Sequence, residues 1–139
     1  METTAPHYPE LNRRYLCSFI DGMIVFTTAM AVGLALQGER LVGVRITAIL
    51  LVILTYEPVL TSRLCTAGQF AMGLRVRRHK SVDDRISLPA AYIRYVVKLI
   101  FGFYSFFAMS FNKERRALHD LVAGSIVVES RAGRDRSDI

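Results

Sequence analysis

The sequence LCSFIDGMIVFTTAMAVGLAL, from Leu16 to Leu36, determines what class of protein this is. An α-helix needs about 20 mostly apolar residues to cross the hydrocarbon core of a bilayer. The stretch has that length, and Asp21 is its only charged residue. We therefore predict a membrane-spanning helix with one acid near its N-terminal end. Because an unpaired carboxylate is costly inside a membrane, Asp21 is expected to need a partner or a proton.

The composition fits a small membrane protein. The chain has 139 residues, enough for one domain; 52% of them are hydrophobic and the formal net charge is +6. The basic residues flank the apolar blocks, which favours anchoring beside anionic lipid over binding to nucleic acid. Cys17 and Cys65 do not have the spacing of a zinc site or a CxxC motif. Neither a metal nor another cofactor is expected.

A second apolar block, from Leu41 to Leu64, contains a second acid, Glu57. A short turn separates the two blocks, so we predict that they form neighbouring antiparallel helices. Asp21 lies as far inside the start of its helix as Glu57 lies before the end of its own, which places both acids at a similar depth. Arg13 and Arg14 precede the first helix and indicate that the N-terminus is cytoplasmic.

The third apolar block, roughly residues 90–111, is aromatic and allows two topologies. If it crosses the membrane, the lysines and arginines divide almost equally, with ten on one side and eight on the other. If it re-enters or lies flat, bent near Gly102, sixteen lie on the cytoplasmic side and two on the other. The positive-inside tendency favours the second arrangement. That arrangement would also let Leu74–Val76 and Ile126–Val128 pair as strands.

The fold class that these patterns predict is an all-α integral membrane protein, with two to three hydrophobic helices in a small bundle and a short cytoplasmic strand pair. Thr66–Gln69 has the spacing of a capping box that begins a short helix, and residues 81–84 are typical of a turn. Residues 1–12 are expected to form an N-terminal tail, 13–128 the membrane domain, and 129–139 a charged, disordered tail.

Three motifs in a fixed order resemble the RDD family of bacterial membrane proteins, which is named for one arginine and two aspartates. Each motif is weak alone, but the ordered set is specific. The motifs are Arg14 with Asp21, Thr66–Gln69 leading into Gly73–Val76, and His119–Gly124 before Val127–Val128.

The resemblance implies that Arg14, Asp21 and Asp120 are the signature residues of the family. It also implies a small multi-helix protein of the bacterial inner membrane, with a role in transport among the functions it suggests. Relatives often have a lysine where this chain has Gln69, which argues against a role that needs a cation at this position.

The intramembrane acids allow two interpretations. In the first, Asp21 and Glu57 form a proton or cation site balanced by Arg14 and Arg94, because two neighbouring carboxylates cannot both ionise cheaply. In the second, these charges form a static ion network that fixes helix packing. Lys98 is a further base that could neutralise either acid.

His119 and Asp120 are expected to be structural, because His7 and His79 do not lie at metal-ligand spacings. Asp120 is predicted to pair with a base such as Arg14 or Arg116. A further basic group is predicted either to contact anionic lipid headgroups or to form a solvated face; it consists of Arg75, Arg77, Arg78 and Lys80.

These patterns leave two main functions open. The first is a small transporter, or transporter subunit, for protons or monovalent cations; two or three helices cannot enclose a pathway, so transport would need a homo-oligomer. The alternative is a non-catalytic membrane adaptor or lipid-binding assembly subunit of a larger complex. No enzyme activity and no catalytic residues are expected, since the sequence has neither a GxSxG motif nor an evident Cys–His pair. Membrane lipids are the expected partners.

Overall fold

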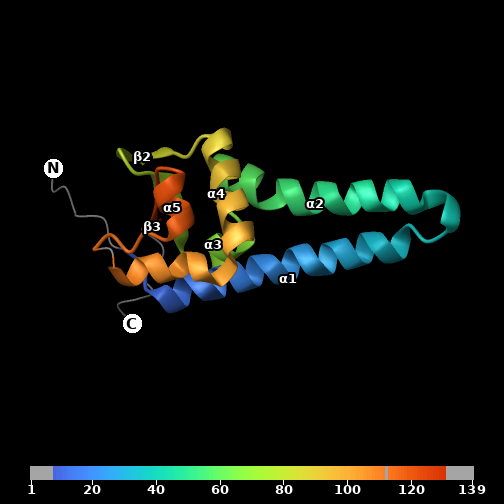
Figure 1. The fold of residues 1–139 in the computed structure, drawn as a ribbon, viewed down its shortest axis with the longest axis horizontal. Coiled ribbons are helices and arrows are strands. Elements are labelled where there is room, and N and C mark those ends of the chain that lie inside the picture. Colours follow the sequence, from blue (N-terminus) through green and yellow to red (C-terminus); the bar gives the residue numbers. More distant parts are fainter. Residues whose placement is uncertain (1–7, 112, 131–139) are drawn as a thin grey trace.

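The computed structural model describes residues 8–111 and 113–130 of the chain. Two long antiparallel helices, α1 (Leu11–Ala35) and α2 (Val42–Arg63), form a hairpin, and the other large elements gather at its open end (Figure 1). A short 3-10 turn, η1 (Glu39–Leu41), joins the two helices. The helix α1 begins within the predicted N-terminal tail, whose first seven residues lie outside the described part, as do residues 131–139 of the predicted C-terminal tail.

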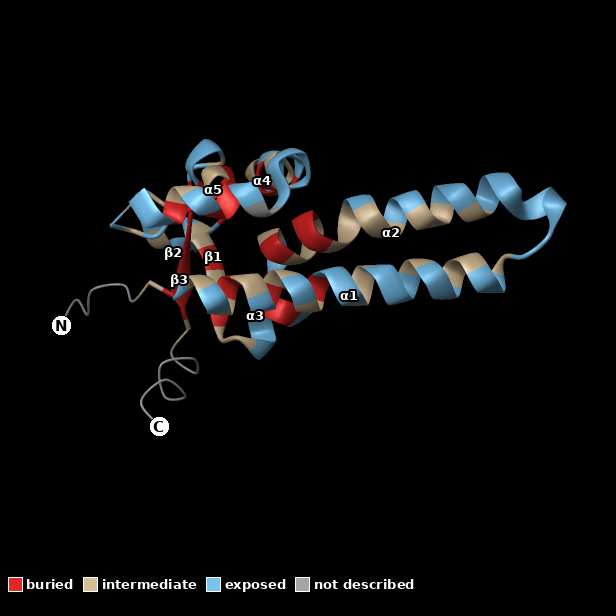
Figure 2. Ribbon diagram, turned by 60° about the horizontal axis from the view of Figure 1, so that its bottom comes forward, coloured by how far each residue is buried: buried red, intermediate tan, exposed pale blue. Residues whose placement is uncertain are grey.

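The hairpin has the length and surface of a membrane-spanning unit. Within the described residues, the segments Leu11–Ala35 and Glu39–Arg63 are long and apolar enough to cross a membrane. Figure 2 shows exposed residues along most of the hairpin and buried residues gathered at its open end. Large apolar side chains such as Phe26 and Leu51 are exposed there. A continuous apolar surface of this kind suits contact with lipid, so the two predicted spans are confirmed as apolar helices of sufficient length.

The third apolar block is bent. The helix α4 (Leu88–Phe101) is followed by the 3-10 helix η2 (Gly102–Phe111), and the axes change direction by 105°. Gly102 lies at the bend with φ +50°, a backbone conformation that glycine adopts far more readily than other residues. The bend predicted near Gly102 is confirmed. Figure 1 shows α4 lying across the end of the hairpin and not along it.

A three-stranded antiparallel sheet lies at the same end, in the order β2-β1-β3. The predicted pairing is confirmed, since β1 (Leu74–Arg78) pairs with β3 (Ser125–Glu129). The turn predicted for residues 81–84 is wrong: this segment is β2 (Ser81–Arg85), and the turn is confined to the two preceding residues. Backbone hydrogen bonds to β1 suffice to hold β2, although its side chains are mostly exposed and polar.

Two five-residue helices flank the sheet strands in the chain: α3 (Ala67–Ala71) lies between α2 and β1, and α5 (Leu118–Val122) lies between η2 and β3. The capping box predicted at the start of α3 is confirmed: the Thr66 hydroxyl accepts from the Gln69 N–H, and the Gln69 side chain accepts from the Thr66 N–H. The apolar core lies between α1, α4 and the sheet, and its buried members are Cys17, Leu74, Val76, Ile86, Ala91 and Val127.

Candidate functional site

Asp120 on α5 lies fully buried between two arginines. Its Oδ2 accepts a hydrogen bond from Arg14 on α1, and its Oδ1 lies 2.9 Å from Nε of Arg94 on α4. The Ser125 hydroxyl and the Ala117 N–H also donate to this carboxylate, at 3.2 and 3.3 Å. One carboxylate therefore joins three helices, and the predicted pairing of Asp120 with Arg14 is confirmed.

The arginines determine the charge state of Asp120. Burial alone would raise its pKa, but the nearby positive charges, with Arg14 the strongest, lower the pKa well below the usual range. Asp120 therefore stays ionised throughout the physiological pH range. Arg116, the alternative predicted partner, instead donates to the carbonyl oxygens of Ser125 and Asp120, at 3.0 and 3.3 Å.

Asp21 on α1 binds the first turn of α3 by hydrogen bonds. Its Oδ2 accepts from the Thr66 hydroxyl at 2.6 Å, and its Oδ1 accepts from the Gly68 N–H at 2.8 Å. The Tyr56 hydroxyl lies 3.3 Å from the same Oδ1. These hydrogen bonds offset the cost of burying the carboxylate, as the basic partners do for Asp120. These donors are the main feature that the sequence-based prediction missed, although the Thr66–Gln69 motif marked their location.

Gly68 lets α3 approach Asp21 this closely. A Cβ at this position would lie 2.2 Å from the carbonyl oxygen of Cys17 and 2.9 Å from Cγ of Asp21. No real side chain is compatible with the first of these distances. The position therefore requires glycine because the backbones of α1 and α3 touch there.

Glu57 on α2 pairs with Lys98 on α4, whose Nζ lies 2.8 Å from each carboxylate oxygen. The prediction that Arg14 and Arg94 balance Asp21 and Glu57 is therefore corrected, because both arginines bind Asp120 instead. Arg94 and Lys98 lie one helical turn apart, and each reaches a different acid.

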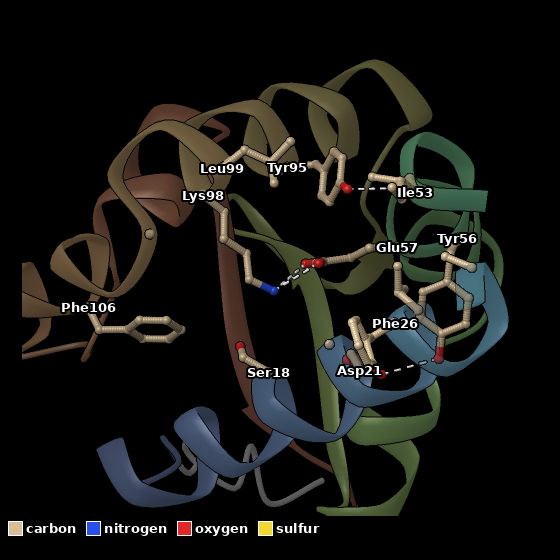
Figure 3. A pocket seen from close by; sticks show the side chains of 14 residues that line it. Ser18, Asp21, Phe26, Ile53, Tyr56, Glu57, Tyr95, Lys98, Leu99 and Phe106 are labelled. Carbon is tan, nitrogen blue, oxygen red and sulfur yellow. Dashed lines mark hydrogen bonds and ion pairs between the residues drawn. The ribbon is translucent and has the colours of Figure 1, made fainter. Parts of the chain in front are cut away.

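Asp21 and Glu57 are both buried and line one cavity of about 470 Å³ between α1, α2 and α4 (Figure 3). They lie on its wall with separate partners, as the figure shows: Glu57 meets Lys98, and Asp21 meets Tyr56. The junction brings three basic side chains beside three acidic ones: Arg14, Arg94 and Lys98, and Asp21, Glu57 and Asp120.

His119 holds η2 against α5. Its Nδ1 lies 2.6 Å from the Ser105 hydroxyl, which also accepts from the His119 backbone N–H at 3.1 Å. Burial, reinforced by the neighbouring arginines, lowers the pKa of His119 to about 3, despite the opposing effect of Asp120. The ring is therefore neutral at pH 7.

Of the other histidines, His79 lies 3.6 Å from Glu114, and His7 falls outside the described residues. No group of His, Cys, Asp or Glu side chains that could hold a metal ion occurs in the described residues.

The basic group predicted to contact lipid headgroups lies on β1 and the turn that follows. Arg78 and Lys80 are exposed, whereas Arg75 and Arg77 are half-buried and donate to the carbonyl oxygens of Leu74 and Asp83. Contact of these four residues with lipid remains a prediction.

The hairpin, its capping elements and the buried ionic junction define a small helical membrane protein. The chain belongs to the RDD family, whose family model matches residues 8–124. The family predicted from the three motifs is thus confirmed. No curated protein and no solved structure matches the chain.

Replacing Gly68 with alanine is expected to push α3 away from α1. The overlap with the Cys17 carbonyl should lower the free energy of unfolding by about 3 kcal/mol, as overpacking does. Thermal unfolding of purified protein in detergent would measure the loss. Gly43→Ala is the matched control, because a Cβ there meets nothing within 4 Å. Equal stability of the two variants would contradict the close contact.

Replacing Asp120 with asparagine should leave two buried guanidinium groups without their carboxylate. Removing one member of a buried ion pair typically costs about 3–5 kcal/mol, so we expect a loss of that size or failure to fold. Asp83→Asn, on the exposed strand β2, should change stability little. If Asp120→Asn has the same unfolding temperature as wild type, the buried Arg14 and Arg94 do not need this carboxylate for stability.

Stability should fall as the pH is lowered from 7 to 5, because unfolded His119 takes up a proton near pH 6.5 whereas the folded residue does so only near pH 3. The expected contribution is about 2 kcal/mol at pH 5. Unfolding at both pH values would show a smaller loss for His119→Asn than for wild type. An unchanged slope in His119→Asn would refute the assignment.

Proposed function

We propose that this RDD protein is a non-catalytic assembly subunit of the bacterial inner membrane, which spans the bilayer twice and has a cytoplasmic N-terminus. The proposal rests on the observation that Asp21, Glu57 and Asp120 already have ion-pair or hydrogen-bond partners. Asp120 binds two arginines, Glu57 binds Lys98, and Asp21 accepts four hydrogen bonds, one of them from the Cys17 thiol. Because these groups join helices, none of the three intramembrane or junction acids Asp21, Glu57 and Asp120 is left unpaired to carry a proton or a cation.

The distribution of basic residues supports the orientation. At the turn end of the hairpin, the described basic residues are Arg40 and Arg45. Most other described lysines and arginines lie at the end that carries the sheet, α4 and α5. The positive-inside tendency therefore favours a cytoplasmic location for this end. In that orientation α4 lies near the inner membrane surface, where exposed Ile93, Val96 and Ile100 would contact lipid.

The exposed apolar surface supports an assembly role. In η2, Tyr104, Phe107 and Phe111 project outward and are largely exposed. Phe107 and Phe111 lie with their ring centroids 6.5 Å apart. Aromatic side chains that are exposed together are typical of surfaces that bind another protein chain. The partner would be either a second copy of this chain or a larger membrane complex.

A second candidate function is transport of protons or monovalent cations by an oligomer. It is favoured by the shared cavity that Asp21 and Glu57 line. One hairpin and a crossing helix do not surround a pathway, so further copies would have to complete it.

Flux assays in proteoliposomes separate the two functions. We expect wild-type protein to transport no more protons, Na⁺ or K⁺ than protein-free vesicles, because its acids are already satisfied. Asp21→Asn, Glu57→Gln and the exposed control Glu39→Gln should be equally inactive. Wild-type flux that disappears in Glu57→Gln but persists in Glu39→Gln would overturn the proposal in favour of transport.

The assembly role predicts a stoichiometric partner. The full chain, extracted from native membranes in mild detergent, should co-purify with another membrane protein or with a second copy of itself. Phe107→Ala should reduce recovery of that partner several-fold, whereas Met30→Ala, at an exposed position far along α1, should not. A monomer that carries no partner under these conditions would count against the proposal.

A further inference from the structure

The cavity between α1, α2 and α4 has an apolar opening. It is partly open, and two of the residues that line it are themselves well exposed, Phe26 at 60% and Leu99 at 57%. Both belong to helix surfaces that suit lipid. A molecule can therefore reach this cavity from the apolar side of the helices.

The inner part of the cavity combines apolar walls with polar groups. Val25, Ala29 and Ile53 supply apolar surface, whereas the Ser18 hydroxyl, the Glu57–Lys98 pair and Asp21 supply polar atoms. The Asp21 oxygens already accept hydrogen bonds from α3 and Tyr56, so the Glu57–Lys98 pair is the ionic group that a bound molecule would contact. Figure 3 shows Lys98 and Glu57 meeting at the cavity wall, with the Ser18 hydroxyl nearby. The volume of about 470 Å³ falls within the range of small-molecule sites, about 300–1,000 Å³. Apolar walls with one polar region match an amphiphile.

The ionic groups define the charge of that amphiphile. Both oxygens of Glu57 accept from Lys98, whose ammonium group has a third N–H available for an acceptor. An anionic headgroup would compete with Glu57 for Lys98, and a cationic one would compete with Lys98 for Glu57. Separating such a pair in a low-dielectric site costs more than leaving it intact. A net-neutral headgroup with both donors and acceptors can bind the intact pair.

We propose that this cavity binds the headgroup region of a net-neutral membrane amphiphile, such as a zwitterionic phospholipid, which enters sideways from the bilayer between α1 and α4. The inference goes beyond the assembly role, because it requires neither a protein partner nor ion transport. The Glu57–Lys98 pair selects the headgroup, and the apolar walls hold the adjoining chain.

Photo-crosslinking tests the site. The full-length protein would be reconstituted with phosphatidylethanolamine or phosphatidylglycerol that carries the same photoreactive acyl chain. We expect phosphatidylethanolamine to label peptides of α1 and α4 about tenfold more than phosphatidylglycerol, a difference typical of one lost polar contact. Ala29→Phe fills the cavity and should abolish most of this labelling. Ala31→Phe, at an exposed position of the same helix, should not.

A charge variant tests the selectivity. Glu57→Gln leaves the Lys98 ammonium without its carboxylate, so the preference should reverse in favour of anionic phosphatidylglycerol. Equal or greater phosphatidylglycerol labelling of the wild type would overturn the proposal, as would unchanged labelling in Ala29→Phe. Crosslinks from the cavity residues to a second protein chain in place of lipid would also overturn it. If Glu57→Gln does not fold, the difference in lipid labelling between Ala29→Phe and Ala31→Phe decides whether the cavity binds the lipid. Lipid labelling is read without any co-purified partner, so this result is independent of the assembly test.

Discussion

The Asp120 carboxylate, held between Arg14 and Arg94, is the interaction on which the arrangement of the other elements depends. Asp120 contacts Arg14, which lies 106 positions earlier in the chain, and Arg94, which lies 26 positions earlier. A buried charge is tolerated only when its partners come into place with it, so α1, α4 and α5 must assemble together. Since β3 directly follows α5, the same contact also brings β3 beside β1.

The cost of burial is offset in different ways at Asp21 and at Asp120. Asp120 is stabilised by opposite charges, whereas Asp21 is stabilised by hydroxyl and backbone donors at the start of α3. The hydrogen bonds to Asp21 depend on a close backbone contact between α1 and α3 that only Gly68 allows. Together the two acids attach both the sheet and the short helices to α1. The burial of Asp21 and Asp120 is thus explained by the attachment of the capping elements to a membrane hairpin.

The sequence predicts the elements of this structure better than their contacts. The length of the apolar blocks predicted α1 and α2, and charge distribution predicted the bend near Gly102 and the β1–β3 pairing. The sequence predicted Arg14 as one of two possible partners of Asp120, but it could not predict which acids Arg94 and Lys98 would meet. Arg94 and Lys98 share a face of α4, but their acids depend on where α5 lies, and a five-residue helix carries no signal for that position. The strand β2 was missed because its polar residues resemble a turn.

The same contacts account for the cavity. Asp21 is held toward α3 while Glu57 is held toward α4, so each acid has its own partners. The space between their helices is lined by apolar side chains, the Glu57–Lys98 ion pair and the hydrogen-bonded Asp21. Moving a charge through this space would require Glu57 and Lys98 to separate in a medium of low dielectric, where their attraction is strong. A neutral molecule can bind there without that cost. The balance of charge that stabilises the fold therefore also limits what the cavity can accept.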